Sequence, residues 1–141
     1  MKKQIFRNST RGQIDRKKII SFSFNGQKLN GYEGDTLASA LIANGIHLTS
    51  RSFKYHRPRG IFSSGSEEPN AYLQIKAGKF EEPNVAAPLI EIFNGLEAKS
   101  SNCWPSVKFD LGAINNILSP IFIAGFYYKT FMHPRRMWPF Y

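Results

Sequence analysis

Hydrophobic and polar residues alternate along IISFSF, residues 19–24, which places Ile20, Phe22 and Phe24 on one face. Such alternation is typical of a strand with one buried face. Asn25-Gly26 follows at once and favours a two-residue hairpin turn, because both positions of that turn take positive φ. The sequence therefore predicts a second strand, over residues 27–32, that returns beside the first.

The pattern then changes to helical spacing. In LASAL, residues 37–41, the apolar side chains recur on one helix face. Asp35 or Thr36 can cap the start of this helix, and Gly45 suits the left-handed position just past its end. Two strands joined by a hairpin and followed by a short helix laid across them predict an α+β fold of the β-grasp type.

The remaining segments are less regular. Residues 46–49 are expected to lead into a loop region, and residues 51–60 to be irregular. AYLQI, residues 71–75, predicts a strand with Leu73 and Ile75 on one face. Residues 89–99 predict a last hairpin around Asn94-Gly95, and residues 109–118 a helix within a segment rich in Pro and aromatic residues.

The 141 residues, 42% of them hydrophobic and 14% aromatic, indicate a folded domain rather than a disordered chain. We divide the chain into a basic N-terminal arm (residues 1–18), a β-grasp domain (19–100) and an extension (101–141). The stretch 111–128 is apolar but interrupted by Asn115, Asn116 and Pro120, so we do not expect a membrane span. No apolar stretch follows the N-terminal charges, and we expect a cytoplasmic protein.

The composition restricts the possible chemistry. One cysteine, Cys103, cannot form an internal disulfide or hold a thiolate-ligated metal centre by itself. The three histidines have no metal-site spacing, the serines of residues 63–66 lack a nucleophile-elbow pattern, and no GxGxxG motif occurs. The formal charge of +9 leaves open a stand-alone basic adaptor that binds nucleic acid or an anionic partner.

Several long stretches carry a family resemblance. GQIDRKKIISFSFNG, YEGDTLASALIANGIHL, RSFKYHRPRGIFSSGSEEPNA and AGFYYKTFM resemble the N-terminal part of the alpha subunit of heterotetrameric sarcosine oxidase. The resemblance implies a β-grasp domain of the 2Fe-2S ferredoxin type that has lost its cluster. Where cluster-bearing relatives have four cysteines, this sequence has Ser63, Glu68, Ala71 and Pro88, none of which supplies a thiolate.

The resemblance also implies an activity for the assembled enzyme. A flavin-dependent oxidoreductase acting on CH–NH donors would demethylate sarcosine to glycine, with hydrogen peroxide and formaldehyde or methylenetetrahydrofolate as further products. FAD, covalent FMN, NAD and tetrahydrofolate would serve that enzyme, and this segment would bind none of them. The implied partners are the beta, gamma and delta subunits and the rest of the alpha subunit, including a dinucleotide-binding domain missing from this sequence.

The basic turn and the cluster-less loop after it form a candidate subunit-docking loop. Its members are Arg51, Lys54, His56, Arg57, Arg59, Gly60 and Ser63. Pro58 stiffens the entry, and we expect Gly60 and Gly65 to allow backbone paths closed to other residues. A second interpretation is that the loop only closes the sheet. Phe53 and Tyr55 could stack on bases, but the family resemblance accounts for the same residues. We therefore expect neither a nucleic-acid nor a membrane partner. We also expect no catalytic, cofactor-binding or metal-binding residue in this chain.

Overall fold

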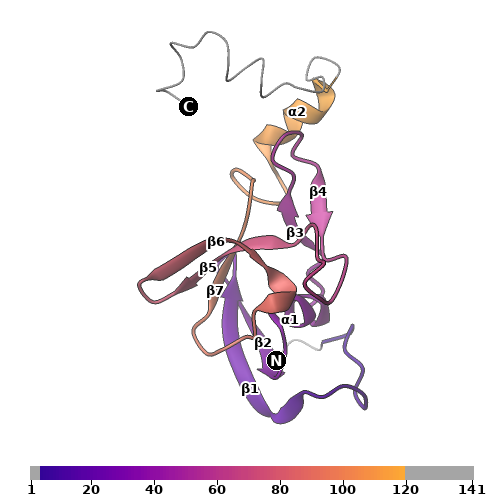
Figure 1. Cartoon of the computed structure of the whole chain (residues 1–141), viewed down its shortest axis with the longest axis vertical. Helices are drawn as coiled ribbons and strands as arrows, with labels where there is room; N and C mark the ends of the chain where they lie inside the picture. The colour runs from indigo at the N-terminus through magenta and orange to yellow at the C-terminus, as the bar shows by residue number, and fades with distance from the viewer. Residues whose placement is uncertain (1–3, 120–141) are drawn as a thin grey trace.

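A computed structural model of the chain describes residues 4–119, and its main feature is a five-stranded mixed sheet (Figure 1). The strand order is β2-β1-β7-β5-β6. The bounds are Asp15–Phe24 for β1, Gln27–Glu33 for β2, Tyr72–Ala77 for β5, Phe80–Ala86 for β6 and Glu97–Ser100 for β7. β7 lies at the centre, parallel to β1 and antiparallel to β5.

The predicted first hairpin is confirmed. Asn25 and Gly26 have φ angles of 49° and 79°, as a turn with two positive φ values requires. Phe22 and Phe24 are buried, and Ile20 packs against the core from the same face. β1 begins at Asp15, earlier than the predicted strand, so the last residues assigned to the basic arm belong to the sheet.

Helix α1 (Leu37–Ala43) covers one face of the sheet, as the spacing predicts. Thr36 is its N-cap, and its side chain accepts a hydrogen bond from the backbone N–H of Ser39. Gly45 follows with a φ of 77°. The α+β, β-grasp prediction is confirmed, and the core between helix and sheet includes Leu29, Leu37, Leu41, Leu73, Ile75, Leu96 and Ala98.

The predicted last hairpin is wrong. Residues 87–89 form a 3₁₀ turn, η1 (Ala87–Leu89), and Glu91 makes only an isolated bridge to Thr36. After the turn at Gly95, β7 pairs with β1 and β5 instead of returning along residues 89–93. The hairpin partner of β5 is β6, a strand that the sequence analysis missed.

The segment after α1 is also more regular than predicted. Leu48–Arg51 and Pro58–Gly60 form strands β3 and β4 of a small antiparallel sheet. This sheet projects from the main sheet toward η2 (Leu111–Ala113) and α2 (Ile114–Ile117) (Figure 1). The predicted helix over residues 109–118 therefore starts later and is split into two short turns.

No helix among residues 4–119 is both long and apolar enough to cross a bilayer. The apolar stretch 111–128, which was not expected to span a membrane, lies partly outside the described residues. So does most of the extension, residues 101–141.

The N-terminal arm packs on the domain through Arg7. Its guanidinium donates to both carboxylate oxygens of Asp35, at 2.9 and 2.6 Å. Asp35 is buried and also accepts hydrogen bonds from the N–H of Tyr32 and the hydroxyl of Ser39. The ion pair thus joins the arm to the turn between β2 and α1.

Removing this guanidinium should destabilise the domain. Arg7→Ala leaves a buried carboxylate without its cation, so we expect the free energy of unfolding to fall by about 3 kcal/mol. Arg11→Ala removes the same charge from an exposed position of the arm and serves as the control. Equal losses in urea unfolding of the two variants would contradict a specific role for the Arg7–Asp35 pair.

Candidate functional site: a loop closed by a buried carboxylate

The loop between β4 and β5 encloses the carboxylate of Glu68, which is only 1% exposed. One oxygen, Oε2, accepts hydrogen bonds from the backbone N–H groups of Phe62 and Ser63, at 2.8 and 2.5 Å. The other, Oε1, accepts from those of Asn70 and Ala71, at 2.8 and 3.0 Å. A carboxylate has about four lone-pair sites, so the four donors satisfy it completely.

These contacts shift the titration of Glu68. Burial alone raises the pKa of the carboxyl group, but the N–H groups of Ser63, Asn70, Ala71 and Phe62 together outweigh that effect. The pKa of Glu68 therefore lies below its ordinary value, because the hydrogen bonds favour the charged form.

The other three positions matched to cluster cysteines do not suit a metal. Ala71 and Pro88 are buried and carry no ligand atom, and the hydroxyl of Ser63 is buried without a hydrogen-bond partner among residues 4–119. No group of three His, Cys, Asp or Glu side chains in the described part of the chain is arranged to hold a metal ion. A 2Fe-2S cluster needs four soft ligands, and among the four matched positions only Glu68 carries a carboxylate, which is already engaged with four N–H groups.

Gly60 and Gly65 serve the loop differently from the prediction. Neither has a positive φ, so neither supplies a backbone conformation closed to other residues. At Gly60, a Cβ atom would lie 2.6 Å from the carbonyl oxygen of His47, where β4 ends beside that backbone. Gly60 is therefore required by close approach.

A second buried carboxylate, that of Asp110, fastens the segment after β7 to β3 and the turn that follows it. It accepts hydrogen bonds from the N–H groups of Trp104 and Gly112 and lies 2.8 Å from Nδ1 of His56. Burial raises the pKa of Asp110, but the hydrogen bonds from Trp104, His56 and Gly112 outweigh it and lower the pKa overall. Gly112 leaves room for the His56 ring, which a Cβ atom there would overlap.

Arg51 belongs to the same internal network. Its guanidinium donates to the carbonyl oxygens of Val107, His56 and Lys108, at 2.9, 2.8 and 3.4 Å, and its Nε lies 3.7 Å from Asp110. Arg51 and His56, both named in the candidate docking loop, thus face into the molecule.

The other charged members of the loop lie nearer the surface. Arg57 is exposed, stacks on Tyr55 and donates to the side chain of Asn116. Arg59 is exposed and donates to the side-chain oxygen of Asn70, while Lys54 lies over the Tyr55 ring. The docking role of the loop stays a prediction. Arg57 and Arg59 are the members of the candidate docking loop that are exposed, so the prediction now rests on these two residues.

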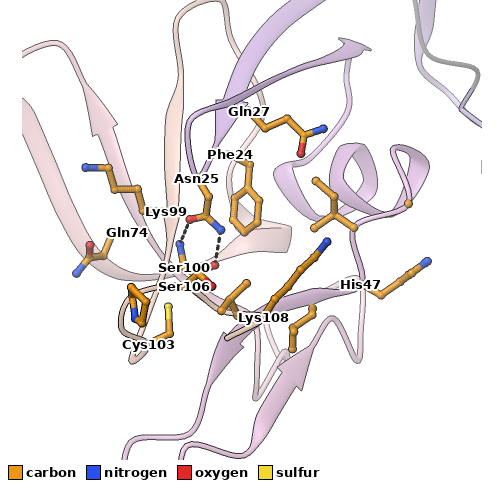
Figure 2. A pocket seen from close by; sticks show the side chains of 15 residues that line it. Phe24, Asn25, Gln27, His47, Gln74, Lys99, Ser100, Cys103, Ser106 and Lys108 are labelled. Carbon is orange, nitrogen blue, oxygen red and sulfur yellow. Dashed lines mark hydrogen bonds between the residues drawn. The ribbon is translucent and has the colours of Figure 1, made fainter. Parts of the chain in front are cut away.

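A separate cavity of about 740 Å³ opens between the end of β1 and residues 103–108 (Figure 2). In it the Asn25 side chain donates to the hydroxyl of Ser100 and accepts from its N–H, both at 2.8 Å. Cys103 lines the cavity, and burial, with a smaller contribution from Asp110, raises the pKa of its thiol although Arg51 opposes the shift. A thiol held protonated is a poor nucleophile.

The sequence placed Glu68 in the loop but did not predict its buried contacts with backbone N–H groups. The role of Asp110 was not predicted either, because the residue fell within an expected helix. A local signal was available for Asp110, which lies two residues before Gly112, because aspartate side chains often accept backbone N–H groups in such turns. For Glu68, the local signal was only its position next to Pro69 in a loop.

Comparison with known proteins gives consistent matches. Residues 17–103 match a family model described as a 2Fe-2S iron-sulfur cluster binding domain. The chain is 55% identical, over 94% of its length, to the sarcosine oxidase subunit alpha of Rhizobium meliloti (strain 1021), and 38% identical, over 61%, to that of Corynebacterium sp. (strain U-96). It spans only 14% and 9% of the lengths of these two relatives.

A solved structure also overlaps with part of the chain. It is the crystal structure of L-proline dehydrogenase from P. horikoshii, with a TM-score of 0.49 and 26% sequence identity, covering 65% of this chain and 17% of that one.

The lowered pKa of Glu68 predicts an acid-dependent loss of stability. A carboxyl group whose pKa is lower in the folded than in the unfolded chain stabilises the fold above its ordinary pKa of 4.5, and this contribution disappears as the pH falls through the folded pKa. Glu68→Gln should therefore be less stable than the wild type by about 3 kcal/mol at pH 7, and the difference should shrink below pH 4.5. Asp110 is present in both the wild type and Glu68→Gln, so its contribution to the pH dependence of stability cancels in the difference between them. Glu67→Gln, at the exposed neighbouring position, should follow the wild type at every pH; a pH-independent gap between Glu68→Gln and the wild type would contradict the assignment.

Proposed function

The chain belongs to the family of 2Fe-2S iron-sulfur cluster binding domains, and from this membership we propose that it is the cluster-free, non-catalytic β-grasp part of a sarcosine oxidase alpha subunit. The observation that carries the proposal is the 55% identity over 94% of this chain to such a subunit. The loop geometry supports the cluster-free part, because Glu68 occupies the interior where thiolates would have to converge.

In this proposal the assembled enzyme oxidises the N-methyl group of sarcosine and releases glycine and hydrogen peroxide, with the methyl carbon leaving as formaldehyde or methylenetetrahydrofolate. The cofactors, FAD, covalent FMN, NAD and tetrahydrofolate, bind to other parts of the heterotetramer. Hydride transfer is the chemistry of such cofactors, so a domain without reactive groups contributes by positioning and by insulating them.

The contribution of this chain is to dock against the flavin-bearing subunit. Arg57 and Arg59 are exposed at the base of the loop, and the ring of Phe62, two residues further along the chain from Gly60, is 80% exposed. Exposed apolar side chains also gather on the segment after β7, at Trp104, Phe109, Leu111, Ile114 and Ile117. Aromatic residues and arginines in this combination are typical of the central part of a protein–protein interface.

Assembly tests the docking proposal. Arg57→Ala with Arg59→Ala removes two exposed guanidinium groups, which contribute little to stability but can contribute about 2 kcal/mol each at the centre of an interface. We expect a nearly unchanged thermal midpoint for the chain and at least tenfold weaker capture of a sarcosine oxidase beta subunit co-expressed with the polypeptide that carries residues 1–141.

The matched control is Lys28→Ala with Lys79→Ala, which removes the same charge from two exposed positions, one near the start of β2 and one in the β5–β6 turn. Capture should be unaffected in this variant. If the two arginine substitutions leave assembly intact, the docking proposal is wrong and the candidate docking loop only closes the sheet. If the wild-type chain ignores the beta subunit but binds nucleic acid with a steep loss of affinity in salt, the alternative of a basic adaptor is favoured.

A further inference from the structure

The four N–H groups around Glu68 form a site with a definite shape. Two of them precede Glu68 in the chain and two follow it. Each oxygen receives one pair, with all four distances between 2.5 and 3.0 Å. Converging backbone N–H groups of this kind make a concave site for an anion.

Two of these donors, the N–H groups of Asn70 and Ala71, are also held by contacts that do not involve Glu68. The carbonyl of Ala71 accepts from the N–H of Ala87 at 2.9 Å, and that of Asn70 accepts from the hydroxyl of Ser50 at 2.9 Å. The side chain of Asn70 also receives the guanidinium of Arg59. The backbone on one side of the site is therefore held in place from outside.

We propose that residues 62–71 form a carboxylate-binding site made of backbone N–H groups, whose permanent ligand is the side chain of Glu68. The family is described by its iron-sulfur cluster, but in this chain the loop encloses the carboxylate of Glu68. The inference concerns the interior of the loop and does not depend on the proposed docking function.

The chemistry of the site defines what it accepts. Two pairs of donors facing two oxygens suit a planar, singly charged carboxylate. The site is shielded from solvent, since Glu68 and Ala71 are almost fully buried. Once Glu68 is shortened to Ala, the atoms removed correspond to those of acetate, so acetate should fit the vacated site and larger carboxylates should not.

Glu68→Ala tests this directly. In the full chain at pH 7, we expect the amide hydrogen-exchange protection of Phe62, Ser63, Asn70 and Ala71 to fall by at least about tenfold, with amides of the central strand β7 much less affected. Sodium acetate should restore the thermal midpoint of this variant in a saturable manner. Sodium chloride and sodium trimethylacetate at the same ionic strength should not restore it, and acetate should leave the wild type unchanged. The control, Glu67→Ala, removes the adjacent exposed carboxylate and should lose no protection.

Glu68→Gln provides a second test if Glu68→Ala does not fold. The glutamine side chain has one acceptor oxygen, so only one pair of amides keeps its partner, either Phe62 and Ser63 or Asn70 and Ala71. Protection should fall for one pair and persist for the other, and acetate should have no effect because the site stays filled. Equal protection of all four amides in the wild type and in Glu68→Gln, or rescue of Glu68→Ala by chloride as strong as by acetate, would overturn the proposal.

Discussion

The loop between β4 and β5 depends on the match between four inward-pointing N–H groups and one carboxylate. A backbone N–H removed from water costs free energy unless it finds an acceptor, and a buried carboxylate costs more unless donors surround it. Either component alone is unfavourable, but together the donors of residues 62, 63, 70 and 71 and the oxygens of Glu68 satisfy one another.

Much of the fold could be predicted because its signals are local. The Asn25-Gly26 turn, the alternation in β1 and the cap at Thr36 each depend on neighbours in the sequence, and each prediction is confirmed. β6 was missed because it is an edge strand that contains Pro83 and two acidic residues, features that protect an exposed edge but erase the alternating pattern. The hairpin over residues 89–99 was wrong for a related reason: β7 pairs with β1 and β5, and no local rule indicates such distant partners.

The candidate site could be predicted only as a region. A concentration of charge between Arg51 and Arg59 indicates a basic loop, but the sequence does not say which side chains point outward. Arg51 faces inward because carbonyl oxygens of Val107 and Lys108, far along the chain, converge on it. Arg7 and Arg51 do not contribute to the positive surface, but their partners Asp35 and Asp110 are buried with them, so these two ion pairs leave the formal net charge of +9 unchanged.

A charged side chain inside the β4–β5 loop supplies acceptors for the backbone N–H groups, whereas an apolar side chain would supply none. An apolar side chain at position 68 would fill the space but leave four N–H groups without acceptors, and the loop would have to turn them toward solvent. The carboxylate holds the amide of Phe62 inward, which is compatible with a ring that is exposed to solvent. It also holds Asn70, the residue that receives the guanidinium of Arg59. Together with the contacts of Ser50 and Ala87, this buried charge helps to position the aromatic and basic groups on the surface of the loop. A surface fixed before association loses less conformational entropy when a partner binds.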